Sequence, residues 1–425
     1  MCNRHFAAFL FAASCLFGQD LQSTEPKERI KAVRALRDSG STAIATLTPL
    51  LSDPDRDVRL ETVRSIVTIG TQHSLDPLVT ATRDNDPEVQ IRATDGLVNF
   101  FVPGYVATGV ARFSAAVRGR FDRENRDKVD PWVTVRPEVI EALGKLTRGG
   151  ASMESRANAA RAVGILRGKE AIPDLLEALQ TKDTEVLFES LIALQKIGDT
   201  SAGPRVVSLL RDLVERVQVA AIETVGLLKT REAVSDLQRV FDSAKSAKVR
   251  RAALTSLAIL ADPNSRPYFD RGFEDKDDLV RAAAAEGYAR LNQSSDVPKL
   301  QQAFDEEKKM PARLGAAFAL VALGQTKTEE FSPLTYLVHT LNSRQYRGIA
   351  EAYLIELSKQ APVRGLIYPF IAQGTRDEKI GLARILAITG DRESIAQVEW
   401  ISKDSDGEVA SEGLRALKAL RARVN

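Results

Sequence analysis

The sequence predicts an all-α protein, a right-handed α-solenoid of about 12 or 13 similar helical hairpins. Three observations lead to this prediction. A pattern of about 31 residues recurs along most of the 425-residue chain. Each copy holds an apolar stripe with helical spacing. An acidic loop stands in front of most stripes, where a helix start needs side chains that accept hydrogen bonds from its free amides.

The first helix of each copy is visible in stretches such as VQVAAIETVGLLKT (217–230) and VRRAALTSLAILADP (249–263). An aliphatic residue opens each stretch, and apolar or small residues follow 4, 5 and 8 positions later. This spacing predicts an amphipathic helix of about three turns. The loops before such helices, for example DPDRD (53–57) and DNDPE (84–88), supply N-cap and first-turn residues.

The spacing of the first helices shows where the pattern changes. Their first residues stand at 28, 58, 89, 155, 186, 217, 249, 280, 312, 378 and 409, so two steps, from 89 and from 312, are 66 residues long. Each long step is predicted to contain one further, irregular unit. A second apolar helix follows most first helices, as in EAIPDLLEALQ (170–180). Such short pairs bury their apolar faces only by stacking on neighbours.

One stretch carries a resemblance to a known family. SRANAARAVGILRGKEAIPDLLEAL (155–179) follows the pattern V-R-x-x-A-x-x-x-L-G with a second helix that begins V/I-P-x-L, although Ser155 stands where the pattern has Val. It resembles HEAT repeats of the short bacterial kind first described in phycobilin lyases, and the resemblance covers nearly all of residues 26–425. It implies a helical-repeat fold. Members of the family serve as scaffolds, adaptors, inhibitors, lyase subunits or DNA-repair enzymes, so it implies no single function.

The charge balance is close to neutral. Fifty-nine basic and 57 acidic residues leave a formal charge of +2, which provides no overall field for holding a polyanion. We therefore expect no nucleic-acid partner. An alternative is a nucleic-acid-binding solenoid, which requires that residues 1–18 be retained and that arginines line one groove.

The N-terminus, MCNRHFAAFLFAASCLFGQD, has an early cation and a short apolar run, as secretory signal peptides do. We expect residues 1–18 to be such a signal and the protein to be exported, periplasmic or associated with the cell envelope. A partial match to a lipoprotein signal makes Cys15 a candidate lipidation site, although Ala12 stands where Leu is usual. Elsewhere the chain has no apolar run of 18 residues, so no transmembrane span is expected.

The sequence suggests no catalytic, cofactor-binding or metal-binding residues. His5, His73 and His339 are too few and too scattered for a metal cluster or a histidine-based triad. DPDRDVRLETVR (53–64) begins like a calcium loop but has Val58 and Arg64 where Gly and Glu are needed. We read it as a capped helix start.

Arginine recurs just after the first residue of several first helices. A functional reading makes these residues a basic ladder for phosphates, whereas the structural reading pairs each with an acidic loop of its own or the next repeat. The second reading is our prediction. The arginines concerned are Arg59, Arg136, Arg156, Arg250, Arg281 and Arg313.

The first break in the pattern separates repeats at 26–99 from those at 135–425. In VPGYVATGVARFSAAVRGRF (102–121) the apolar residues form one helical stripe, and a charged loop follows, so we expect an irregular helix plus loop at 100–134. This helix either replaces a missing one in the stack or serves as an interaction element. The tentative partner-binding residues here are Tyr105, Arg112, Phe113, Arg118, Arg120 and Trp132.

The second break is an irregular, tyrosine-rich unit at 325–377, which holds Tyr336, Tyr346, Tyr353 and Tyr368. Large side chains either fill an irregular junction there or form a binding patch, since tyrosine is enriched at binding surfaces. The tentative patch residues are His339, Tyr346 and Arg347.

Together these observations predict an exported, non-catalytic scaffold or adaptor that binds a partner protein. The alternative from another class is a lyase-like or ligand-handling subunit related to the bilin lyases, which would need a lined polar pocket that the sequence does not reveal. The oligomeric state is left open.

Overall fold

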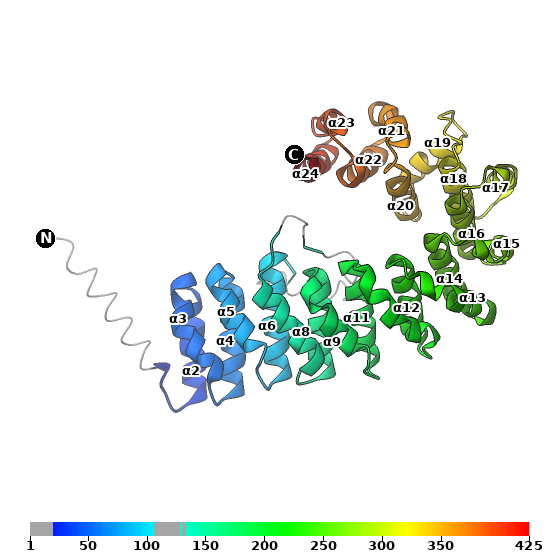
Figure 1. The fold of residues 1–425 in the computed structure, drawn as a ribbon. Coiled ribbons are helices and arrows are strands. Elements are labelled where there is room, and N and C mark those ends of the chain that lie inside the picture. Colours follow the sequence, from blue (N-terminus) through cyan, green and yellow to red (C-terminus); the bar gives the residue numbers. More distant parts are fainter. Residues whose placement is uncertain (1–19, 106–127, 130–132, 425) are drawn as a thin grey trace. The chain divides into compact units, whose positions relative to one another are not determined.

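The computed structural model describes residues 20–105, 128–129 and 133–424 (Figure 1). Helices make up most of this part of the chain, and none of these residues lies in a β-strand. The chain divides into two units, Met1–Val206 and Val207–Asn425. The predicted all-α solenoid is confirmed.

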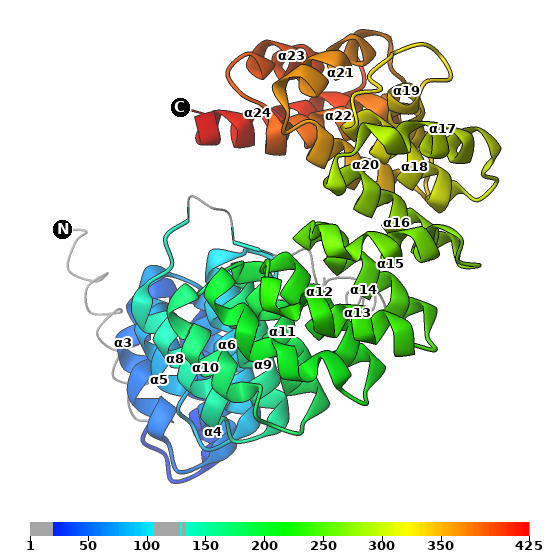
Figure 2. The same ribbon diagram turned by 45° about the vertical axis from the view of Figure 1, so that its right-hand side comes forward.

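In unit 1 each repeat has a first helix and a second helix, and the two kinds form two layers (Figure 2). In the first layer α6 contacts α4 and α9, and α9 contacts α11. In the second layer α8 contacts α5 and α10. The first helices are α2 (Pro26–Arg37), α4 (Arg56–Ile69), α6 (Pro87–Phe101), α9 (Met153–Ile165) and α11 (Thr184–Ile197). The second helices are α3 (Ile44–Leu47), α5 (Leu75–Ala81), α8 (Pro137–Gly149) and α10 (Ile172–Ala178).

Unit 2 repeats the same arrangement, and the 3-10 helix η6 (Thr200–Arg211) spans the boundary between the units. Its first helices are α12 (Glu215–Leu227), α14 (Ala247–Leu260), α16 (Asp278–Leu291), α18 (Met310–Ala322), α20 (Arg347–Leu357), α22 (Arg376–Thr389) and α24 (Gly407–Val424). Its second helices are α13 (Val234–Ser243), α15 (Arg266–Phe273), α17 (Val297–Glu306), α19 (Pro333–His339), α21 (Ala361–Gln373) and α23 (Ser394–Ile401).

Aspartates from the acidic loops start the first helices, as predicted. The Asp55 side chain accepts hydrogen bonds from the amides of Asp57 and Val58, at 2.9 and 3.1 Å. Asp86, Asp183, Asp277 and Asp406 do the same for α6, α11, α16 and α24. The stretch 53–64 is therefore a capped helix start and not a calcium loop.

Small residues let neighbouring first helices approach closely. A Cβ atom added to Gly164 would lie 2.7 Å from the Cα of Ala193, and one on Gly315 would lie 2.8 Å from the Cα of Ala282. Such distances leave no room for a side chain. Glycine at these places thus sets the spacing of α9 on α11 and of α18 on α16.

The two long steps in the pattern have different structural causes. The step from 312 to 378 contains one further helix pair, α20 and α21, as predicted. In the step from 89 to 155 the prediction of a further unit is wrong. Helix α8 packs in the second layer, so α6 and α8 are the two helices of one repeat, and the irregular segment is an insertion between them.

The start of the predicted helix at 102–121 also differs from the prediction. Helix α6 continues to Phe101, and Val102 and Gly104 then lie in a turn, with φ +92° at Gly104. A helix cannot begin at Val102, because the backbone of this turn is not helical. Residues 106–121 of the predicted helix lie outside the described residues.

Candidate functional site

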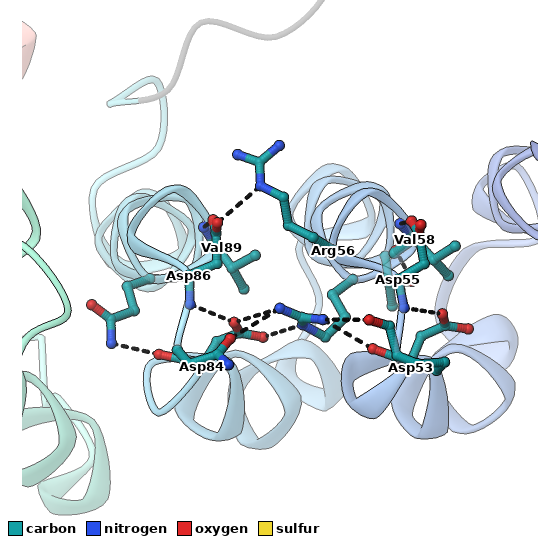
Figure 3. Close-up of polar contacts among 12 residues, drawn as sticks. Asp53, Asp55, Arg56, Val58, Asp84, Asp86 and Val89 are labelled. Atoms are coloured by element: carbon teal, nitrogen blue, oxygen red, sulfur yellow. Dashed lines mark hydrogen bonds and ion pairs between the residues drawn. The ribbon is translucent and has the colours of Figure 1, made fainter. Parts of the chain in front are cut away.

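The edge of the acidic loops is held together by ion pairs between successive repeats. Arg29, Arg59, Arg250, Arg281 and Lys379 each bind a carboxylate 24 to 26 residues further on, at 2.7 to 3.0 Å. Figure 3 shows this edge at α4 and α6, where Arg56 points toward Asp86 at 2.9 Å.

The predicted pairing of the arginine ladder is thus confirmed for Arg59, Arg250 and Arg281. Arg136 also binds a carboxylate, but that of Asp76 on α5, because α8 belongs to the second layer. For Arg156 and Arg313 the prediction is wrong, since neither meets an acidic side chain among the described residues. Arg156 donates to the carbonyl of Thr147 at 3.0 Å, and Arg313 lies over the rings of Phe304 and Tyr336.

The opposite edge of each unit carries the turns that join a first helix to its second helix. Most of these turns are two to four residues long, as between α4 and η3 (Gln72–Ser74) or between α16 and η9 (Ser294–Asp296). Two are much longer, the insertion between α6 and α8 and residues 323–332 between α18 and α19. Both long turns therefore fall at the same place in the repeat. We call them the first and the second long turn.

The first long turn is anchored at both ends in unit 1. Where it leaves α6, the amide of Gly104 donates to Oδ1 of Asn99 at 3.2 Å. Where it returns, the amide of Val129 donates to the carbonyl of Ile165 at 2.8 Å, and the Val129 side chain is buried. The segment thus crosses from α6 to the end of α9 before it enters α8.

Tyr105, one of the predicted partner-binding residues, lies beside a polar cluster on the first helices. Its environment is desolvated, and burial together with the nearby Asp95 carboxylate raises the pKa of Tyr105 to about 12. Asn158 donates to Asp95 at 3.0 Å, and Arg161 binds the buried carboxylate of Glu189 at 2.6 Å. Burial also raises the pKa of Asp95. The sequence had not indicated this cluster, which joins α6, α9 and α11.

A cavity of about 560 Å³ lies where the returning segment meets the ends of α8, α9 and α11. Aliphatic side chains and the ion pair between Lys169 and Asp199 both contribute to it. That pair and the bonds from Ser201 hold the pKa of Asp199 well below its usual range. The described lining residues are Val129, Val133, Val135, Ile140, Leu166, Arg167, Gly168, Lys169, Glu170, Ile197, Gly198 and Asp199.

The second long turn is held by a buried serine. The hydroxyl of Ser332 lies 2.7 Å from the carbonyl of Lys327 and 2.8 Å from that of Glu329, so its proton is shared between them. The amide of Ser332 donates to the carbonyl of Glu329 at 3.0 Å. The next residue, Pro333, starts α19. This turn leaves the Phe331 side chain 84% exposed.

In the tyrosine-rich unit, three tyrosines fill junctions between helices. Tyr353 stacks on Phe318 with ring centroids 4.6 Å apart and donates to Glu286 at 2.7 Å. Tyr336 packs edge-on against Phe304, and the hydroxyl of Tyr368 meets that of Ser394 at 2.8 Å. These contacts agree with the packing reading for Tyr336, Tyr353 and Tyr368.

The predicted patch residues of that unit are not assembled around one another. His339 is half exposed and its Nδ1 lies 2.7 Å from the buried carboxylate of Glu378. Tyr346 is partly buried and Arg347 is exposed, both at the start of α20. No contact joins His339 to either of them among the described residues. Arg112, Phe113, Arg118, Arg120, Trp132 and Cys15 lie outside the described residues.

The described part of the chain offers no obvious reaction centre. It contains no group of three or more His, Cys, Asp or Glu side chains placed to hold a metal ion. Nor does any helix within it have both the length and the apolar character needed to cross a membrane. What the arrangement supplies instead is two long turns at equivalent places and a polar cluster beside the first of them.

Comparisons with known proteins agree with the repeat pattern. The family model for HEAT repeats matches residues 17–98, 140–216, 205–289 and 243–321. We found no match among curated proteins. Solved structures with a similar course include an engineered protein, at 19% identity over 95% of this chain and 98% of that one, with a TM-score of 0.40.

Two further solved structures come from natural proteins. The complex of CpcE and CpcF of phycocyanin lyase from Nostoc sp. PCC7120 is 17% identical over 60% of this chain and 90% of that one, with a TM-score of 0.36. Kap121p is 12% identical, with a TM-score of 0.44, and the chain spans about half of its length, 49%, while 96% of this chain is covered. These likenesses imply nothing about partners or activity. The matched repeats cover more than half of the sequence, and the chain belongs to the HEAT-repeat family.

Proposed function

We propose that this protein is a non-catalytic scaffold that binds a partner protein through its long turns, of which each unit carries one. The observation that carries the proposal is that both long turns fall at the same place in the repeat. In stacked repeats, insertions at one place map to one face, and that face is often the one that binds.

The edge of the acidic loops is a weaker candidate for the partner-binding site. Its cations Arg59, Arg250 and Arg281 already bind carboxylates, so they do not form a free groove for phosphates. This also supports a protein partner over a nucleic acid. Export to the cell envelope, with a lipid anchor at Cys15 as a further alternative, belongs to the same proposal and rests on the N-terminal sequence alone.

The cavity beside the first long turn favours a second candidate, a ligand-handling subunit. Its mixture of aliphatic and charged lining suits a small amphipathic molecule. Titration of the purified protein with a bilin, followed by visible absorbance, tests this candidate. A saturable spectral change that is weakened in Lys169→Ala, which removes an exposed charged side chain from the cavity lining, would support it over the scaffold.

Photo-crosslinking in cells tests the scaffold. A photoreactive amino acid is placed at Pro103 or at Lys128, which flank the insertion, and at Lys182 in an acidic loop as the matched control; all three residues are exposed. We expect one defined protein to be captured from Pro103 or Lys128 and not from Lys182. Equal capture from all three positions, or none from either flank, would contradict binding at the first long turn.

A further inference from the structure

We propose that the second long turn is a preformed docking element in which Phe331 inserts into an apolar pocket of a partner protein whose rim carries Lys or Arg. This inference rests on the proposed scaffold function and names the chemistry of one contact. The element consists of Lys327, Glu329, Glu330, Phe331 and Ser332.

The first step of the argument is the exposure of Phe331. Of the phenylalanine and tryptophan side chains in the described part of the chain, it is the most exposed, at 84%, ahead of Trp400 at 47%. Burying a phenylalanine side chain removes a large apolar surface from water and so favours association. An isolated exposed apolar residue is ordinary on a surface. The conclusion therefore needs a second observation.

That second observation is the construction of the turn. Ser332 is 7% exposed, and its hydroxyl shares its proton between the carbonyls of Lys327 and Glu329 and lies 3.1 Å from the hydroxyl of Thr335. On the other side of the turn, the amide of Gln325 donates to the carbonyl of Leu320 at 2.9 Å. The backbone around Phe331 is thus fixed before any partner binds. A fixed backbone reduces the entropy lost on association.

The charges beside Phe331 indicate what surrounds the partner's pocket. Glu329 and Glu330 are both exposed, and neither forms an ion pair within the described part of the chain. With Lys327 included, the turn keeps a net charge of −1 from its two acids and one base. Opposite charges at the rim of an interface steer association and set its orientation. A phenylalanine directly preceded by two carboxylates therefore fits an apolar pocket rimmed by cations. It fits an anionic membrane surface poorly.

The experiment places a photoreactive amino acid at the exposed Thr328 in the full-length chain and follows capture in cells. The test variants are Phe331→Ala, Phe331→Trp and the pair Glu329→Lys with Glu330→Lys. The matched control is Leu213→Ala, because Leu213 is fully exposed at 101% and lies in an acidic loop. Capture of some protein is not sufficient by itself, so the crosslinked peptide is sequenced and the captured protein is purified for titration.

We expect Phe331→Ala to lower affinity for the captured protein at least tenfold, Phe331→Trp to retain binding, and the charge reversal to weaken binding and invert its salt dependence. The crosslinked surface should carry Lys or Arg. Unchanged affinity in Phe331→Ala, an acidic crosslinked surface, or capture of a second copy of this chain would each overturn the proposal. Thermal unfolding of Phe331→Ala should match the parent, which separates loss of binding from loss of fold.

The two proposals fail separately. If Pro103 or Lys128 captures a partner while Phe331→Ala binds it normally, the scaffold function stands and the docking element does not. If capture from Thr328 depends on Phe331 while the flanks of the insertion capture nothing, the partner binds unit 2 alone.

Discussion

The guanidinium of Arg59 lies 2.7 Å from the carboxylate of Asp84, which stands 25 residues further along the chain in the next repeat. Arg250 and Asp275, and Lys379 and Asp404, are separated by the same 25 residues. One repeat thus supplies the cation and the next supplies the anion. The ion pairs thereby join neighbouring repeats that are otherwise linked only through the connecting loop of the chain.

The Arg59–Asp84 pair is largely buried, so breaking it should be costly. We expect Asp84→Ala to destabilise unit 1 by about 3 kcal/mol, because Arg59 would keep its charge in a desolvated place with only neutral acceptors, Asn85 and backbone carbonyls, left to it. The midpoint of urea unfolding measures this. As a control, Glu141→Ala breaks the exposed pair with Lys145 and should cost less than about 0.5 kcal/mol. Equal effects of the two substitutions would contradict a role for burial.

Lys379 and Asp404 provide a dependence on pH. The Lys379 ammonium, 2.8 Å from Asp404, and the amide of Asp406 hold the pKa of Asp404 below its ordinary value of 3.8. A carboxyl group with a lowered folded-state pKa contributes stability that is complete above the ordinary value and is lost as the pH falls through the lower one. We expect Asp404→Asn to be less stable than the parent at pH 6, with the difference shrinking as the pH falls below 3.8. A constant difference across this range would show that Asp404 acts through packing instead.

Glu286 should show the opposite dependence. Burial raises its pKa above 4.5, although the bond from Tyr353 and the charge of Arg290 oppose the shift. Such a group favours the folded state below its ordinary pKa, and that contribution is lost as the pH rises through the raised value. Glu286→Gln should therefore gain stability relative to the parent between pH 4.5 and pH 8, measured by unfolding midpoints. A variant that loses stability at pH 8 would mean that Glu286 is ionised and paired with Arg290.

Tyr353 makes a ring stack and a hydrogen bond, and two substitutions can separate their contributions to stability. Tyr353→Phe keeps the stack on Phe318 and removes the bond to Glu286, so about 1–2 kcal/mol should be lost. Tyr353→Ala removes both and should cost about 3–5 kcal/mol. Unfolding midpoints of the two variants and of Tyr346→Phe, a tyrosine with no such contact among the described residues, make the comparison. If the two substitutions lower the free energy of unfolding by the same amount, the stack of Tyr353 on Phe318 contributes nothing to stability.

Much of the fold could be predicted from the sequence because one physical rule recurs. An acidic cap, an aliphatic stripe and small residues are sufficient to predict helices such as α4, α11 and α16. The position of α8 could not be predicted in this way. Its apolar residues Val139, Ile140 and Leu143 suit either layer, and only contacts distant in the sequence, such as that of Arg136 with Asp76, distinguish them.

The candidate site was less predictable for a related reason. Composition singled out Tyr353, which the structure buries, and overlooked Phe331, which it exposes. The exposure of Phe331 depends on how the Ser332 hydroxyl folds the turn, and a serine before a proline has no unique reading in sequence. Asp95 and Glu189 likewise become neighbours only when α6, α9 and α11 stack.

The glycines between first helices allow the stacking itself to be tested. A Cβ atom added to Gly164 would lie 2.7 Å from the Cα of Ala193, a backbone atom that cannot move aside alone. Gly164→Ala should therefore destabilise unit 1 by about 1–3 kcal/mol. Gly149 ends α8 with no atom within 4 Å of an added Cβ, and Gly149→Ala should be neutral or stabilising by up to about 1 kcal/mol. Both substitutions lower the entropy of the unfolded chain equally, so the difference between their urea midpoints isolates the close approach of α9 and α11. If Gly164→Ala is as well tolerated as Gly149→Ala, α9 and α11 have room to separate, and their spacing is set by polar contacts such as the Arg161–Glu189 pair and not by packing.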